Sequence, residues 1–137
     1  MMDPPKVLLE QSFLHAVADD RHAQHTLDIA EYLRLVERYE VEQVLLVAVS
    51  DHLRPLAGRR HRGPFAPIDR LWVGFQHRRA ARRVRGADDL DLALTLVMAE
   101  RHRVRTIATV DPRFESYHLS LLPGFDGGVS TTAAALG

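Results

Sequence analysis

Residues 7–10 read Val-Leu-Leu-Glu, a short apolar run that ends on an acid. Such a run, bounded by polar residues, is typical of a buried strand in a parallel sheet. The pattern recurs at residues 43–49, which lead through Ser50 to Asp51, and at residues 104–110, which lead to Asp111. Helical segments are predicted between these strands. The alternation of strand and helix predicts an α/β fold with a parallel sheet and right-handed crossovers.

The connecting segments have the spacing of amphipathic helices. We predict helices over about 12–18, capped by Ser12, over 22–40, and from Asp88 or Asp89 to about 102. The apolar stripe of the second helix is predicted to be Ala23, Leu27, Ala30, Leu33 and Val36. That of the third is predicted to be Leu90, Ala93, Leu94, Val97 and Met98.

The rest of the chain is predicted to be less regular. A short helix follows Ser50, residues 57–69 read as a loop, residues 70–85 as a basic helix and residues 116–121 as an edge strand. We therefore expect a single three-layer domain over residues 1–122, with about four parallel strands flanked by helices. Residues 123–137, rich in Gly, Thr and Ala, are expected to form a tail.

Composition excludes several classes of protein. The chain has 137 residues, which suits one domain, and its 18 basic and 18 acidic residues balance. It has no cysteine, which excludes disulfides, thiolate catalysis and Cys-based zinc or iron–sulfur sites. Neither a membrane-spanning run nor a signal peptide is evident, so we expect a soluble cytoplasmic domain.

Acidic residues follow all three predicted strands. Glu10, Asp51 and Asp111 are expected at one edge of the sheet, with Asp91 beside them in the first turn of the last helix. Four carboxylates within about 5 Å would repel by roughly 3 kcal/mol per pair, which favours a bound cation. Oxygen ligands without cysteine select Mg²⁺ or Mn²⁺, and such an ion would support phosphodiester hydrolysis. The alternative for each acid alone is a helix cap or a turn residue.

These segments together resemble the PIN domain, the nuclease fold of the toxins in bacterial VapBC toxin–antitoxin pairs. The opening of the chain at residues 7–14 is similar to the family's strand, acid, x, Ser/Thr start. Residues 46–51 are similar to its second strand and acid, and residues 91–101 to the helix that bears its third acid. Residues 106–111 followed by Phe114 resemble the closing strand, fourth acid and aromatic residue.

The resemblance implies a metal-dependent endoribonuclease, often a dimer and often inhibited by an antitoxin. Glu10, Asp51, Asp91 and Asp111 would hold Mg²⁺ or Mn²⁺, and Ser12 would support the first carboxylate or the water shell of the ion. The family's first acid is usually Asp, and Glu10 places its carboxylate roughly 1 Å farther out. The spacing leaves Asp88 and Asp89 as alternatives to Asp91 for the third acid.

The segment between residues 52 and 87 carries ten arginines and a single acid, Asp69. Guanidinium groups suit phosphate oxygens, and the interleaved Trp72 and Phe75 could stack on bases. We predict an RNA-binding surface made of Arg59, Arg60, Arg62, Arg78, Arg79 and Arg82. The alternative is a solvated charged face, with Trp72 and Phe75 in the core.

Other interpretations differ in function. A catalytically silent PIN-like module would bind RNA or a protein through the arginines. A phospho-receiver needs a late-strand lysine, but Lys6 is the only lysine, and no glycine-rich phosphate loop occurs. His22 and His25 are spaced for a metal, but surface or capping roles are favoured. Leu92, Leu96 and Ala99 lie off the predicted core stripe and could be buried by the sheet or by a second subunit of a homodimer.

Overall fold

The centre of the molecule is a sheet of five parallel strands in the order β3-β2-β1-β4-β5. The computed structural model describes residues 3–57, 67–86 and 89–124. The strands are β1 (Lys6–Leu9), β2 (Leu45–Val49), β3 (Ile68–Leu71), β4 (Thr106–Ala108) and β5 (Ser120–Leu122). The predicted parallel α/β sheet is confirmed.

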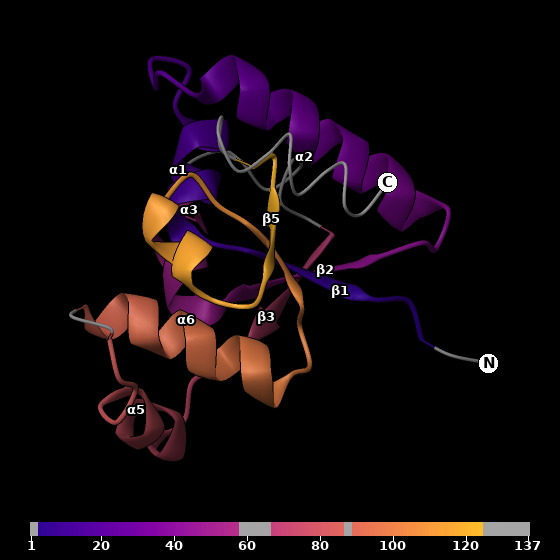
Figure 1. The fold of residues 1–137 in the computed structure, drawn as a ribbon. Helices are drawn as coiled ribbons and strands as arrows, with labels where there is room; N and C mark the ends of the chain where they lie inside the picture. The colour runs from indigo at the N-terminus through magenta and orange to yellow at the C-terminus, as the bar shows by residue number, and fades with distance from the viewer. Residues whose placement is uncertain (1–2, 58–66, 87–88, 125–137) are drawn as a thin grey trace.

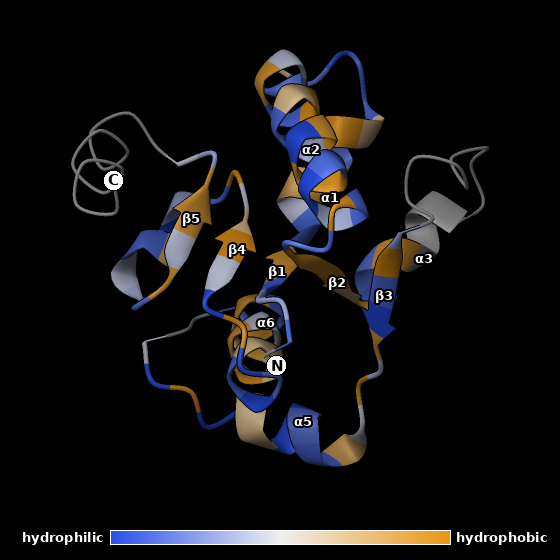
Figure 2. Ribbon diagram, turned by 90° about the vertical axis from the view of Figure 1, so that its right-hand side faces the viewer, coloured by the Kyte–Doolittle hydropathy of each residue, from blue (hydrophilic) through white to orange (hydrophobic). Residues whose placement is uncertain are grey.

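Helices cover both faces of this sheet, which gives the predicted three layers (Figure 2). On one face lie α1 (Gln11–Ala18) and α2 (His25–Glu40), which contact each other. On the other lie α5 (Phe75–Ala81) and α6 (Leu90–Arg101), also in mutual contact. The helix α3 (Ser50–Ala57) continues directly from β2 and contacts α1 and β3 (Figure 1).

Alternating side chains of the strands feed two hydrophobic cores. In β1, Val7 and Leu9 pack with α1 and α2, while Leu8 packs with α6 on the other face. All three are almost fully buried, as expected for a parallel strand covered on both sides. The apolar runs in the sequence therefore correspond to central strands with no solvent-facing side.

The predicted buried face of α2 is wrong. Leu27 and Leu33 are half exposed, whereas Asp28, Tyr32 and Leu35 are buried. The buried positions follow helical spacing, but one of them is the acidic residue Asp28. A prediction based on apolar residues alone therefore selects a different face of the helix. A buried acid thus conceals the orientation of this helix.

Asp28 is a buried acid whose ionisation lowers the stability of the fold. Its carboxylate is buried, and neither oxygen has a hydrogen-bond partner among the described residues. Burial raises the pKa of Asp28 from 3.8 to about 6, opposed by the nearby His22 and His25 and reinforced by Glu31. The folded chain therefore holds this proton to a higher pH than the unfolded chain does. Ionisation of Asp28 costs stability as the pH rises from about 4 to about 6, and the cost is complete above that.

Asp28→Asn should stabilise the fold at neutral and alkaline pH, because Asn resembles the protonated acid and cannot ionise. We expect a gain of about 2 kcal/mol in unfolding free energy at about pH 8, shrinking as the pH falls toward about 5. Urea denaturation at the two pH values measures this difference. Asp20→Asn, at an exposed position, is the control. A gain that is equal at both pH values would contradict the explanation.

The basic segment folds differently from the prediction. Residues 68–71 form β3, and the helix is restricted to Phe75–Ala81, not 70–85. In β3 only Ile68 and Leu71 are buried, a spacing of three that imitates a helix. The predicted edge strand is confirmed as β5, but it starts at Ser120 because a 3-10 helix, η1 (Pro112–Ser116), precedes it.

The predicted core stripe of α6 is confirmed except for Leu90, which is half exposed beside the N-cap. Leu92 and Ala99 are buried within the chain itself, so they give no support to a dimer. Among the described helices, none has the length and apolar character required to cross a membrane. The division at residue 122 stays a prediction, since residues 125–137 lie outside the described range.

Candidate active site

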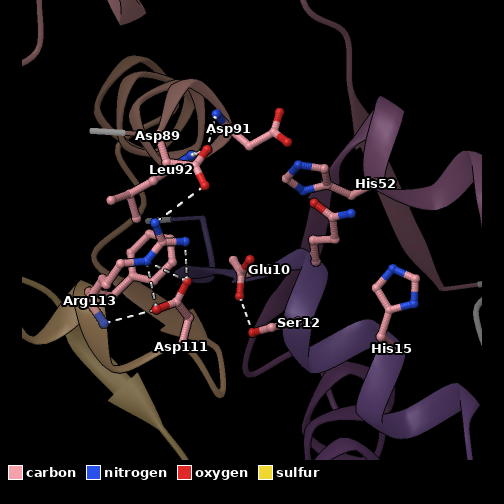
Figure 3. A pocket seen from close by; sticks show the side chains of 11 residues that line it. Glu10, Ser12, His15, His52, Asp89, Asp91, Leu92, Asp111 and Arg113 are labelled. Atoms are coloured by element: carbon pink, nitrogen blue, oxygen red, sulfur yellow. Dashed lines mark hydrogen bonds and ion pairs between the residues drawn. The ribbon is translucent and has the colours of Figure 1, made fainter. Parts of the chain in front are cut away.

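The acids after β1 and β4 meet at one edge of the sheet, as the sequence predicts. Glu10 follows β1, Asp111 follows β4, and Asp91 lies in the first turn of α6. All three face one cavity of about 260 Å³ (Figure 3). Its other lining residues are Gln11, Ser12, His15, His52, Asp89, Leu92, Arg113 and Phe114. The structure therefore brings together three of the four predicted acids, together with Ser12.

Glu10 is buried and fixed by two hydroxyl groups. Its Oε1 accepts hydrogen bonds from the Ser12 hydroxyl and, at 2.5 Å, from Thr109 Oγ1. The same hydroxyls accept from the chain after β4: Val110 N donates to Ser12 Oγ, and Asp111 N to Thr109 Oγ1, each at 3.0 Å. These bonds tie the end of β1 to the end of β4 around the carboxylate of Glu10.

Ser12 has the supporting role that the resemblance implies, but it does not cap α1. The helix begins at Gln11 with Glu10 at the N-cap, so the Ser12 hydroxyl lies in the first turn and points at Glu10. Thr109 completes the same arrangement and is not among the predicted site residues. Its position in the chain, two residues before Asp111, is the only sequence signal for it.

Asp89 and Asp91 have different roles at the start of α6. Asp89 is the N-cap and accepts hydrogen bonds from Asp91 N and Leu92 N, which lower the pKa of Asp89. Asp91 is exposed, and its side chain extends into the cavity (Figure 3). Of the alternatives for the third acid, Asp91 is therefore the better placed, and Asp88 lies outside the described residues.

Arg113 forms one wall of the cavity. Its guanidinium donates to Asp111 at 2.7 and 3.1 Å and reaches Asp89 at 3.3 Å (Figure 3). The hydrogen bonds from Arg113 are the main cause that holds the pKa of Asp111 below its usual range. Asp111 is therefore ionised, and its charge is balanced by this guanidinium.

The structure does not place Asp51 in the cavity. Its carboxylate accepts a hydrogen bond from Arg78 of α5 at 3.0 Å, and Asp51 is not a lining residue. The next residue of α3, His52, lines the cavity instead. Successive residues of a helix are about 100° apart, so a shift of one position decides which side chain faces the site. His52 is not among the residues that the sequence predicts for the site.

His52 is an enclosed imidazole. It is 5% exposed, and its Nδ1 has no hydrogen-bond partner among the described residues. Burial lowers the pKa of His52, and the negative charges of Glu10 and Asp91 oppose this effect without reversing it. The ring is therefore neutral at physiological pH, the form that binds metal ions.

The donor set of the cavity suits a divalent ion, since it combines several carboxylates with a neutral imidazole. As they stand, no three histidine or acidic side chains in the described ranges are grouped closely enough to hold one. Two features contribute to this: Arg113 engages Asp111 and Asp89, while Arg78 engages Asp51. An ion would compete with Arg113 for the carboxylate of Asp111.

The predicted RNA-binding surface is only partly described. Arg59, Arg60 and Arg62 lie outside the described residues, while Arg78 and Arg79 lie on α5 and Arg82 follows it. Trp72 and Phe75 are 70% and 74% exposed, so the alternative that places them in the core is wrong. Arg79 lies over the Phe75 ring at 5.8 Å from its centroid.

The remaining histidine prediction is resolved in favour of local contacts. His22 Nδ1 accepts from Gln24 N at 3.0 Å, and His25 Nδ1 contacts the carbonyl oxygen of Ala16 at 2.8 Å. Both rings are thus engaged where α1 leads into α2, and neither lines the acidic cavity.

Comparison with known proteins supports the fold. No protein-family model and no curated protein matches the sequence. Among solved structures, the chain is similar to VapC20 of Mycobacterium tuberculosis, described as a sarcin–ricin loop cleaving toxin. The two share 14% identity over 80% of this chain and 93% of VapC20, with a TM-score of 0.57. The chain therefore has the fold of a VapC toxin, the PIN-domain fold that the sequence resemblance predicts.

Proposed function

We propose that this protein is a metal-dependent endoribonuclease and the toxin of a toxin–antitoxin pair. The observation that carries the proposal is the convergence of Glu10, Asp91 and Asp111 on one cavity, in a fold shared with a toxin that cleaves the sarcin–ricin loop. Carboxylates at this edge of the sheet suit Mg²⁺ or Mn²⁺. A bound ion would supply an activated water and stabilise the charge that develops on the phosphate.

Residues of the cavity would position the ion and the substrate. Glu10, fixed by Ser12 and Thr109, presents a carboxylate that needs no reorganisation before reaction. Asp91 and Asp111 face it across the cavity and complete the negative site. Arg113, once separated from Asp111, is placed to donate to a phosphate oxygen. Asp51, paired with Arg78, would act at a distance from the reacting atoms.

The direct test is cleavage of RNA. The purified chain is incubated with ribosomal RNA and with a sarcin–ricin loop hairpin, in Mg²⁺ and separately in Mn²⁺, beside the Asp111→Asn variant. We expect cleavage at defined positions by the wild type and none by the variant. Binding of the same hairpin is measured in parallel. Binding without cleavage in either ion would favour a catalytically silent module and contradict the proposal.

RNA should dock on the exposed side chains of Trp72, Phe75, Arg79 and Arg82, beside α5. Trp72→Ala is expected to weaken single-stranded RNA binding by about 1–3 kcal/mol, the contribution of one stacked base. The affinity of the wild type should fall with salt, with a log–log slope of about −0.7 per phosphate contact. Fluorescence anisotropy measures both effects. Tyr117→Ala, an aromatic change near η1, is the control. An RNA affinity that does not change with salt concentration would contradict binding at this surface.

Three further features of the proposal are the expectations of partner, place and assembly that the sequence raises. An antitoxin protein would inhibit the chain, the cytoplasm would be the place of action, and a homodimer would be the assembled form. Co-expression with candidate antitoxins tests the first. Sedimentation of the purified chain tests the last.

A further inference from the structure

Arg113 occupies the hydrogen-bonding positions of two acids at once. Its Nε and Nη2 donate to the carboxylate of Asp111 at 3.1 and 2.7 Å, and its backbone N donates to Oδ1 of the same group at 2.9 Å. Its Nη1 donates to Oδ2 of Asp89 at 3.3 Å, while Oδ1 of Asp89 accepts from the backbone of α6. All four carboxylate oxygens of these two acids are therefore engaged within the chain.

These contacts contribute to the poor fit of the cavity, as it stands, to a divalent ion. Within the described ranges, no three histidine or acidic side chains are grouped to hold a metal. Asp111 is the N-cap of η1 and Asp89 the N-cap of α6, and the guanidinium joins the two elements on one side of the cavity (Figure 3). An external cation would therefore meet two carboxylates whose charge an internal cation already balances.

The contact lies where an anion can reach it. The side chain of Arg113 is 46% exposed and that of Asp89 is 40% exposed. Exposed ion pairs contribute little to stability, so separating them costs little. A guanidinium binds two phosphate oxygens with the same pair of parallel hydrogen bonds that it makes to a carboxylate. A phosphodiester in the cavity could therefore replace the carboxylates as the partner of Arg113.

We infer that Arg113 makes an autoinhibitory contact, which closes the acidic cavity to cations until a phosphodiester takes the guanidinium from Asp111 and Asp89. The inference rests on the proposed function, since it concerns the regulation of that site. Two carboxylates that lose their guanidinium leave negative charge unbalanced, which raises the affinity of the cavity for a cation. Linkage requires the cation to raise the affinity for the phosphodiester by the same factor. The wild type should thus bind the two together and each alone only weakly.

The test measures Mn²⁺ binding, with dimethyl phosphate as the phosphodiester. Electron paramagnetic resonance follows free Mn²⁺ in dimethyl phosphate and in sodium chloride of equal ionic strength. For the wild type we expect a Mn²⁺ affinity at least about tenfold higher in dimethyl phosphate. Arg113→Gln should bind Mn²⁺ in chloride at least about tenfold more tightly than the wild type does. Dimethyl phosphate should change the affinity of this variant by less than about twofold.

Arg101→Gln is the matched control, because it removes the same charge from an exposed position of α6 that does not line the cavity. It should show the wild-type affinities in both solutions. Arg113→Lys is the second variant, in case the first does not fold. It keeps the charge but lacks the planar fork that joins the two acids, so it too should bind Mn²⁺ more tightly than the wild type in chloride.

Each outcome bears on one of the two proposals. Wild-type Mn²⁺ affinity that is equal in the two solutions would overturn the autoinhibitory contact, and this comparison needs no variant. A full effect of dimethyl phosphate in either Arg113 variant would overturn it as well. Coupled binding in a chain that cleaves no RNA would confirm the contact and overturn the proposed ribonuclease. RNA cleavage without coupled binding would overturn the contact alone.

Discussion

Glu10→Gln is expected to reduce RNA cleavage by about a thousandfold or more while the chain stays folded. The amide oxygen of Gln can still accept the hydrogen bonds that Ser12 and Thr109 donate, so the end of β1 keeps its connection to the end of β4. What the variant loses is the buried negative charge. The measurement is the single-turnover cleavage rate of a hairpin RNA, beside a thermal melt of the same protein.

Glu100→Gln is the control, since it makes the same change at an exposed position of α6. It should cleave RNA at the wild-type rate. A Glu10→Gln protein that is folded and cleaves within about tenfold of the wild type would show that this carboxylate is only a structural group.

Phe114→Ala should have the largest effect on stability. The Phe114 ring is 1% exposed and packs in the core beneath α6, with Leu8 and Ile107 among its cluster. Removing a buried ring of this size costs about 3–5 kcal/mol of unfolding free energy. For a chain of this length we expect the melting temperature to fall by about 10 °C or more. Scanning calorimetry measures the shift.

Phe75→Ala is the matched comparison, because the Phe75 ring is 74% exposed on α5. Its unfolding free energy should change by less than about 0.5 kcal/mol. Equal losses in the two variants would indicate that Phe75 is covered in solution, for example by a second subunit.

The sequence predicts the central strands well because β1 and β2 are buried on both faces and so consist of apolar residues. The sequence does not predict β3, because its two buried residues are three positions apart, with Asp and Arg between them and Pro before them. It fails again at α2, where Asp28 interrupts the buried face. In both places the local pattern is ambiguous, and contacts distant in sequence decide the outcome.

The sequence predicts those site residues that directly follow a strand of the parallel sheet. Glu10 and Asp111 follow from the topology of a parallel sheet, but the choice between Asp51 and His52 depends on the exact residue at which α3 begins. Helix boundaries are the least certain feature of any sequence. The pairing of Arg113 with Asp111 depends on the turn of η1, and no spacing rule for regular elements anticipates it.

The hydrogen bonds from Ser12 and Thr109 to Glu10 affect which substitutions this site can tolerate during evolution. Glu10 is held by small hydroxyl side chains at residues 12 and 109, which are 97 positions apart. These three positions should be inherited together. In a library randomised at all three and selected for toxicity, Glu at the first position should be recovered with Ser or Thr at the other two.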